Sequence, residues 1–267
     1  MKLLKIARSS PAGGLMAAAA LFTGAASAAD LTVGANIGNV PWEFQDASGK
    51  TVGFEVDLVT EIAKRMGKSV EFVNIPFNGL FSAVQSGRIN MAVSSITITN
   101  KRLESVTFAQ PYYDSDQSLT VTAASGITGL SGMSGKVVGV DTGSTGDMWV
   151  GENGAKYKIG ETRRFEGLSP AMLDLVAGRI DGYISDIPAL LYYVKDKPEL
   201  KVVERITTGE KYSIMFNKDD PLAKEVNAVI TELKKEGYIA KLHETWFGAP
   251  ADASTSTVTV MDMPALK

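Results

Sequence analysis

The chain has 267 residues, a formal net charge of −3 at pH 7, one histidine and no cysteine. The absence of cysteine excludes disulfides, thiolate catalysis and lipid attachment through an N-terminal cysteine. A single histidine, His243, and no cysteine do not supply the usual ligands of a zinc site, and the acidic balance argues against a nucleic-acid partner. We therefore expect no metal and no other cofactor.

Residues 1–28 have the features of a secretory signal peptide. Basic residues near the start precede a short apolar run over residues 15–22, and Ala26-Ser27-Ala28 is a small-residue cleavage site. Three of the 27 basic residues and none of the 30 acidic residues lie in this leader, which leaves the mature chain with a net charge of −6. We expect cleavage after about Ala28 and export, without an anchor, to a bacterial periplasm.

The remaining chain is long enough for two lobes, since domains usually contain about 100 to 150 residues. Apolar residues alternate or recur at helical spacing along most of it, in the mixed order typical of an α/β protein. The pattern predicts strands at 31–35, 70–73, 106–109, 117–123, 136–141 and 201–203, and helices at 58–66, 79–85, 170–177, 187–195, 223–236 and 239–246.

The stretch from Met91 to Glu104 is the most informative. It begins as a buried strand and continues into a helix, for which Thr99 and Asn100 are possible N-caps. Arg102 lies in the first turn of that helix, where a cation opposes the helix dipole. Two interpretations follow: Arg102 is a solvated surface residue, or it binds the carboxylate of a ligand.

A unit of helix, Gly-Arg-Ile-Asx, strand and polar loop occurs twice. It includes Gly87-Arg88-Ile89-Asn90 and, 91 residues later, Gly178-Arg179-Ile180-Asp181. Each half thus delivers polar residues from the end of a strand. The small-residue turn at 142–149 also follows a strand, and its main-chain N–H groups could close around an anion. This arrangement predicts two α/β lobes with a ligand cleft between them.

Two segments that pass between the lobes are expected near 113–118 and 207–213. Lobe 1 would then contain residues 29–114 and 213–248, and lobe 2 residues 115–212. The last segment, 249–267, is rich in Ala, Ser and Thr, and is predicted to be a flexible tail.

Five short segments together resemble a known family, the periplasmic amino-acid-binding proteins of ABC importers, solute-binding family 3, which includes glutamine, histidine and lysine/arginine/ornithine binders. The resemblance covers residues 31–248 and implies a type II periplasmic binding protein fold, hinged by two crossing segments. The segments are Val52–Leu58, Ser95–Thr99 with Arg102, Phe108–Tyr113, Gly178–Asp181 with Asp186, and Trp246–Gly248.

The resemblance implies a role for each matching position. Arg102 would clamp the α-carboxylate of an amino acid, and Thr97 would bind the same carboxylate. The main-chain oxygen of Ser95 would accept from the α-ammonium group, with which Asp186 would pair. Thr145 would donate its main-chain N–H to the carboxylate.

The remaining implied contacts include both matches and departures from the family. Phe77 matches a wall over the ligand side chain, Ile96 lies within the matching segment Ser95–Thr99, and Ser144 precedes Thr145 in the small-residue turn. Asn36 stands where an acidic residue is usual, and Asn39 where an aromatic wall is usual; Trp42 or Tyr113 would have to replace that wall. Asp141 occupies a position that is lysine in glutamine binders and apolar in histidine binders.

Asp141 bears on the choice of ligand. An unpaired second carboxylate would be repelled by Asp141 at short range, so glutamate and aspartate are disfavoured, whereas an amide, ammonium or guanidinium side chain is suited. The other interpretation of Asp141 is a capping carboxylate for the turn that follows it.

The predicted function is capture of a polar or cationic amino acid and its delivery to the permease and ATPase of an ABC importer, by a protein that acts as a monomer. Because no Ser-His-Asp or Cys-His set is available, we expect no enzyme activity. Alternatives are a cyclohexadienyl dehydratase-like enzyme on the same fold, a binder of an opine or ectoine-like derivative, or a ligand-sensing partner of a chemoreceptor.

Overall fold

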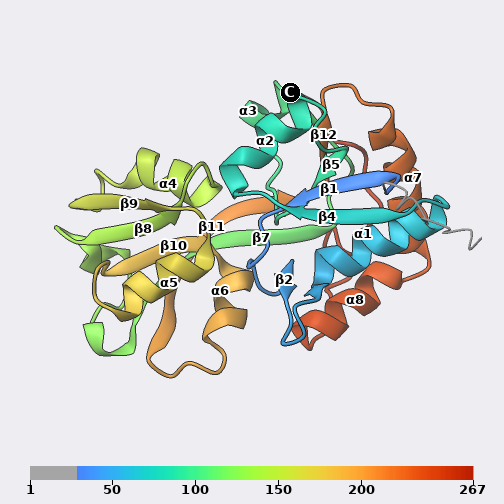
Figure 1. Ribbon diagram of the computed structural model, residues 1–267. Helices are drawn as coiled ribbons and strands as arrows, with labels where there is room; N and C mark the ends of the chain where they lie inside the picture. The colour runs from blue at the N-terminus through green and yellow to red at the C-terminus, as the bar shows by residue number, and fades with distance from the viewer. Residues whose placement is uncertain (1–28, 267) are drawn as a thin grey trace, which may run out of the picture.

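The computed structural model describes residues 29–266, so the predicted signal peptide, residues 1–28, and Lys267 lie outside it. Two lobes lie side by side, each built on a five-stranded mixed sheet with helices packed against it (Figure 1). This is the two-lobed α/β architecture that the sequence predicts. Within the described range, none of the helices combines the length and apolar character needed to cross a membrane.

Lobe 1 contains the sheet with the strand order β4-β1-β5-β12-β6, in which β1 is parallel to β4 and β5, and β12 is antiparallel to both of its neighbours. The strands are β1 (Leu31–Ala35), β4 (Val70–Asn74), β5 (Met91–Ala92), β6 (Val106–Phe108) and β12 (Met215–Asn217), with a hairpin of β2 (Phe44–Gln45) and β3 (Thr51–Val52) beside them. The helices are α1 (Phe54–Arg65), α2 (Phe77–Gln85), α3 (Asn100–Leu103), α7 (Leu222–Lys235) and α8 (Tyr238–Phe247).

Helix α1 illustrates how the sequence determines these elements. Leu58, Val59 and Ile62 recur on one face and are fully buried in the same core cluster as the β1 side chains; burial of each contributes about 1.5–3 kcal/mol. The helix begins directly after Gly53, whose φ is 142°. A Cβ atom there would lie 2.1 Å from the main-chain oxygen of Trp42, so only glycine fits.

Lobe 2 contains the second sheet, in the order β11-β7-β10-β8-β9, with β8 parallel to β9 and β10, and β7 antiparallel to β10 and β11. The strands are β7 (Tyr113–Thr122), β8 (Val137–Asp141), β9 (Glu161–Phe165), β10 (Gly182–Asp186) and β11 (Leu200–Tyr212). The helices are α4 (Thr145–Asn153), α5 (Leu168–Val176) and α6 (Ile187–Val194), with short 3-10 turns η1 (Ala123–Ser125) and η2 (Leu130–Met133).

Strands β7 and β11 carry the chain between the lobes. They pair antiparallel from Leu200↔Thr122 to Tyr212↔Tyr113 and lie side by side through the middle of the molecule, green and orange in Figure 1. The sequence predicts a short strand at 201–203 and a separate return segment; instead β11 is one strand of 13 residues. The register of β11 relative to β7 changes between Ile206 and Glu210. This irregularity lets β11 stay paired with β7 while it passes from one lobe to the other.

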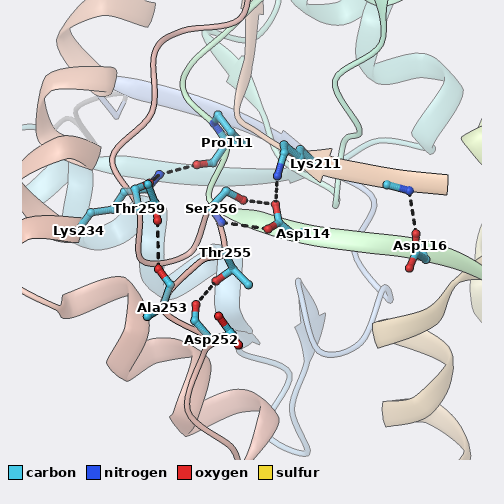
Figure 2. A network of polar contacts seen from close by, with 11 residues as sticks. Pro111, Asp114, Asp116, Lys211, Lys234, Asp252, Ala253, Thr255, Ser256 and Thr259 are labelled. Carbon is cyan, nitrogen blue, oxygen red and sulfur yellow. Dashed lines mark hydrogen bonds and ion pairs between the residues drawn. The ribbon is translucent and has the colours of Figure 1, made fainter. Parts of the chain in front are cut away.

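The C-terminal segment, residues 249–266, packs on lobe 1, so the prediction of a flexible tail is wrong. Ser256 and Thr257 are only 1% and 2% exposed. The Ser256 hydroxyl and N–H both donate to the carboxylate of Asp114 near the start of β7, the N–H at 3.0 Å (Figure 2). Asp114 also accepts a 2.6 Å bond from Lys211 of β11, which ties the segment to both crossing strands.

A buried lysine holds the next part of this segment. Lys234 of α7, 4% exposed, donates to the main-chain oxygen of Thr259 at 2.9 Å and to that of Pro111 at 2.6 Å (Figure 2). The Met261 N–H donates to Gln110 Oε1 at 3.1 Å. Short hydroxyl side chains suit a solvated tail, but they also suit a packed segment when each has a partner, as here.

Candidate ligand-binding site

A cavity lies between the lobes at the carboxyl ends of strands from both sheets. Asn36 follows β1, Ser94 and Ser95 follow β5, Asp141 ends β8 and Asp186 ends β10. This is the position in which open α/β sheets bind ligands. The cavity is lined by ten of the twelve predicted positions, namely Asn36, Asn39, Phe77, Ser95, Thr97, Arg102, Asp141, Ser144, Thr145 and Asp186, together with Ser94, Leu168 and Ser185.

Trp42 and Ile96 are the two predicted positions that do not line the cavity. Both side chains are fully buried in lobe 1. The Trp42 ring packs edge-on against Phe54 and Tyr113, at centroid distances of 5.5 and 4.7 Å, within an aromatic core cluster. Trp42 and Tyr113 thus pack in the core and do not line this cavity, and the Ile96 side chain belongs to a second core cluster.

Two buried carboxyl groups of lobe 1 hold Ser95 and its neighbour Ser94 in place. The φ of Ser95 is 45°, which is unusual for a residue other than glycine. The Ser95 N–H donates to both oxygens of Glu55 in α1, at 3.0 and 3.1 Å, and Ser94 Oγ donates to Glu43 at 2.6 Å. Burial raises the pKa of Glu43 well above its ordinary value, with the neighbouring Glu55 as the second cause. The pair is most stable when it shares a proton.

Arg102 lies in α3, and its N–H donates to the predicted cap Thr99 at 3.1 Å. The side chain is 5% exposed, which excludes the interpretation of a solvated surface arginine. Its Nη1 donates to the main-chain oxygen of Thr97 at 2.7 Å, the guanidinium lies 5.4 Å from the centroid of the Phe77 ring, and Nε has no partner. Burial lowers the Arg102 pKa to about 10, so the group stays cationic at neutral pH.

Asp186 is the carboxylate that lobe 2 presents to Arg102 and Ser95. It accepts from Gln117 Nε2 at 2.5 Å and from Ser95 Oγ at 3.1 Å. Burial, followed by the charge of Glu210, raises its pKa to about 7. A cation placed beside Asp186 would favour the ionised form.

Asp141 is a second carboxyl group of lobe 2 in the cavity. Its Oδ1 atom is buried and has no hydrogen-bond partner. Burial raises the pKa of Asp141 to about 7. The turn after it is capped by Ser144, which accepts from the Asp147 N–H at 3.1 Å, so the alternative of Asp141 as the helix cap is wrong.

The lobes touch across the cavity and leave little space. Arg102 Nη2 donates to the main-chain oxygen of Gly143 at 3.2 Å, and Ser95 Oγ bonds Asp186. The cavity has a volume of about 30 Å³, room for roughly two water molecules. This is a closed arrangement, and an amino acid would enter only by separating the lobes and replacing these bonds.

Comparison with known proteins identifies the family. Residues 31–249 match the bacterial extracellular solute-binding proteins, family 3. The chain belongs to this family. The predicted resemblance, the two-lobed type II periplasmic binding fold and the role of a solute-binding protein are confirmed.

Individual relatives cover most of this solute-binding protein. The L-cystine-binding protein TcyJ of Escherichia coli is 31% identical over 78% of this chain and 79% of its own length. The ABC transporter arginine-binding protein 1 of the same species is 27% identical over 87% of this chain and 97% of its own length. A solved structure described as an ancestral arginine-binding protein bound to arginine is 35% identical, with a TM-score of 0.77, and covers 82% of this chain and 98% of its own.

Two polar residues of this solute-binding protein contact the site and are missed by the sequence analysis. Gln117 of β7 bonds Asp186, and Glu210 of β11 accepts from Thr97 Oγ1 at 2.7 Å. Both lie in the crossing strands, where a polar residue in the sequence is usually taken to face solvent. Their position in these strands could have indicated them, because polar side chains on segments that pass between two lobes lie where the lobes meet.

Proposed function

We propose that this solute-binding protein captures a cationic amino acid of the arginine and lysine type and delivers it to an ABC importer. The observation that carries this proposal is the charge of the closed cleft. Arg102 is the one cation among the described residues that line the cavity, whereas Asp141 and Asp186 both line it. A third carboxylate, Glu210, contacts the lining residue Thr97. A ligand with two cationic groups and one carboxylate, which has a net charge of +1, would offset the excess negative charge of Asp141 and Asp186 over Arg102.

The α-amino-acid end of the ligand would lie between Arg102 and Asp186. Arg102 has a free Nε, and its Nη2 bonds a main-chain oxygen that a carboxylate could replace as acceptor. Asp186 and the Ser95 hydroxyl would meet the α-ammonium group. One lobe would then grip mainly the carboxylate and the other the amine, so that the zwitterion stabilises the closed form.

Asp141 would meet the far end of the ligand. A buried acceptor without a partner costs about 1–3 kcal/mol, and the guanidinium or ammonium of an arginine or lysine side chain would supply the missing donor to Oδ1. The Phe77 ring, which lines the cavity, would cover the aliphatic part. Glutamate and aspartate would bring a carboxylate toward Asp141 and are disfavoured. The arginine-binding relatives support this choice.

Isothermal titration calorimetry on the mature protein, unfolded and refolded to remove ligand, tests the proposal. We expect L-arginine, L-lysine or L-ornithine to bind in the micromolar range, about −8 kcal/mol, and glutamate to bind far more weakly. The Asp141→Asn variant should bind arginine about tenfold or more weakly than the wild type. The matched variant Asp196→Asn, at an exposed position of lobe 2, should keep the wild-type affinity. Absence of binding by every cationic amino acid would contradict the proposal.

The proposed role is binding without turnover. No histidine or cysteine is among the described residues that line the cavity, and a general acid would have to be a carboxyl group such as Asp141. Incubation with arogenate or prephenate tests the dehydratase alternative, since an aromatic product would contradict the proposal. Opines and ectoine belong in the same calorimetric screen.

We further propose that the protein acts as a monomer in the periplasm after removal of its signal peptide. Its transport partners would be the permease and ATPase chains of an ABC importer. Light scattering of the mature protein tests the monomer, and stimulation of the reconstituted ATPase by the ligand-loaded protein tests the partnership.

A further inference from the structure

Glu210 is a buried carboxylate beneath the ligand cavity. It lies on the crossing strand β11 and is 7% exposed, but it does not itself line the cavity. Four donors surround it: Thr97 Oγ1 at 2.7 Å and Thr145 Oγ1 at 3.0 Å on Oε2, and Gln117 Nε2 at 2.9 Å and Thr208 Oγ1 at 3.2 Å on Oε1. This environment suits an ionised carboxylate, which only accepts.

The two threonines come from opposite lobes. Thr97 follows β5 in lobe 1, and Thr145 is the first residue of α4 in lobe 2. Both line the cavity, and their hydroxyl oxygens lie 3.5 Å apart. Glu210 therefore binds one hydroxyl from each lobe when the lobes are closed.

A hydroxyl group has one hydrogen to donate. Because Thr97 and Thr145 each give that hydrogen to Glu210, their oxygens have only lone pairs left for a ligand. Gln117 adds to this effect, since its Nε2 is engaged by Glu210, by Asp186 at 2.5 Å and by Thr145 Oγ1 at 3.1 Å. The side chains of Thr97, Thr145 and Gln117 can thus accept hydrogen bonds from a ligand but have no donor left to offer.

We propose that Glu210 is a positioning residue that orients the Thr97 and Thr145 hydroxyls as acceptors, so that the cleft selects a ligand with an ammonium group at this point. The inference rests on the proposed function, because it concerns the α-ammonium group of the same ligand. It also changes the role expected for the Thr97 hydroxyl, which accepts from the ammonium group instead of donating to the carboxylate.

A change in selectivity distinguishes this role from a structural one. If Glu210 only braced the closed form, its replacement would weaken all ligands equally. If it orients the hydroxyls, its replacement weakens ligands with an α-ammonium group more than their des-amino counterparts. The quantity to measure is the ratio of the dissociation constants of 5-guanidinopentanoate, which is arginine without its α-amino group, and L-arginine.

The main variant is Glu210→Gln, which leaves one acceptor oxygen for four donors; Glu210→Leu removes the acceptor altogether. We expect the ratio to fall about tenfold, the size of one lost hydrogen bond to a charged group, and the exposed Glu199→Gln beside β11 to leave it unchanged. In a Thr97→Val background, Glu210→Gln should change the ratio much less, because the hydroxyl through which it acts is gone.

An equal loss of affinity for both ligands, or additive effects of Glu210→Gln and Thr97→Val, would overturn the inference. If Glu210→Leu fails to fold, the comparison of Glu210→Gln in the wild-type and Thr97→Val backgrounds is sufficient to test the inference. If the wild type binds glutamine but no cationic amino acid, the proposed function fails, and Glu210 is tested by the same ratio with glutamine and its des-amino counterpart.

Discussion

The guanidinium of Arg102 in lobe 1 donates to the main-chain oxygen of Gly143 in lobe 2 at 3.2 Å. The residue proposed to hold the ligand carboxylate thus already joins the lobes in the closed form. Its second anchor, the main-chain oxygen of Thr97 at 2.7 Å, lies within lobe 1. A bound carboxylate would replace the interlobe bond and keep the anchor, so Arg102 would be aimed correctly before and after ligand entry.

Replacement of Arg102 by alanine should weaken ligand binding by about 2–5 kcal/mol, because it leaves the ligand carboxylate buried without its partner. Calorimetry measures the change, and Arg88→Ala, at an exposed position in the first Gly-Arg-Ile unit, is the control. An affinity within about twofold of wild type would mean that the carboxylate is bound elsewhere.

The buried support of Ser95 leads to a prediction about stability. Glu55 accepts from the Ser95 N–H through both oxygens and from the hydroxyl of Tyr112. Glu55→Ala leaves these donors unsatisfied, and we expect it to lower the free energy of unfolding by about 2–4 kcal/mol and to weaken binding as Ser95 shifts. Glu61→Ala, on the same helix but in surface ion pairs with Lys64 and Arg65, should cost less than about 1 kcal/mol.

Urea denaturation gives both free energies. The expectation is contradicted if the two variants are equally stable. A stable Glu55→Ala variant with wild-type affinity would show that Ser95 needs no such support.

The fold was largely readable from the sequence because its signals are local. Apolar spacing in α1, the cap at Thr99 and the repeated Gly-Arg-Ile unit each depend on neighbours in the chain. The hydrogen bonds of Ser256 to Asp114 depend on contacts between residues far apart in sequence. Composition alone therefore predicted a flexible tail where the structure has a packed segment.

The site was predictable only in part, for a related reason. Asp141 and Asp186 end strands and Arg102 lies in the helix after β5, and strand ends meet at the edge of a sheet. Glu210 lies inside a crossing strand between Gly209 and Lys211, a context typical of a solvent-facing residue. Its burial results from the closure of two lobes over it, which no local pattern encodes.

The carboxyl groups of lobe 2 predict how binding depends on pH. Burial raises the pKa values of Asp141 and Asp186 to about 7 in the closed form. Between about pH 4 and pH 7 the folded protein therefore holds protons that the unfolded chain has lost. The protonated carboxyl groups of Asp141 and Asp186 therefore contribute to the free energy of unfolding at acid pH, and this contribution is lost as the pH rises through 7.

Burial favours the protonated form of these two groups, whereas a cationic ligand favours the ionised form, because it stabilises the carboxylates. We expect the affinity for arginine to fall between about pH 8 and pH 5.5, and binding near pH 7 to release protons. Calorimetry in buffers with different ionisation enthalpies measures this release, and Asp141→Asn should reduce it. An affinity that rises toward acid pH would contradict the prediction.

The C-terminal segment predicts a loss of stability on truncation. Deletion of residues 249–267 removes the donors of Ser256 from Asp114 and leaves Lys234 with only the Pro111 oxygen as acceptor. Burial already lowers the pKa of Lys234 to about 8, so loss of an acceptor should destabilise the charged form further. We expect truncation to cost about 2–4 kcal/mol of unfolding free energy.

Two serine variants separate the effect of the Ser256–Asp114 contact from the effect of deleting the whole segment. Ser256→Ala should lower the unfolding free energy by about 1–2 kcal/mol, because its hydroxyl bonds a charged partner. Ser254→Ala changes an exposed serine that bonds only Asp252 within its own turn, and should have an effect below about 0.5 kcal/mol. Equal thermal denaturation midpoints for the two variants, with a truncated protein as stable as the full chain, would mean that the segment rests on lobe 1 without stabilising it.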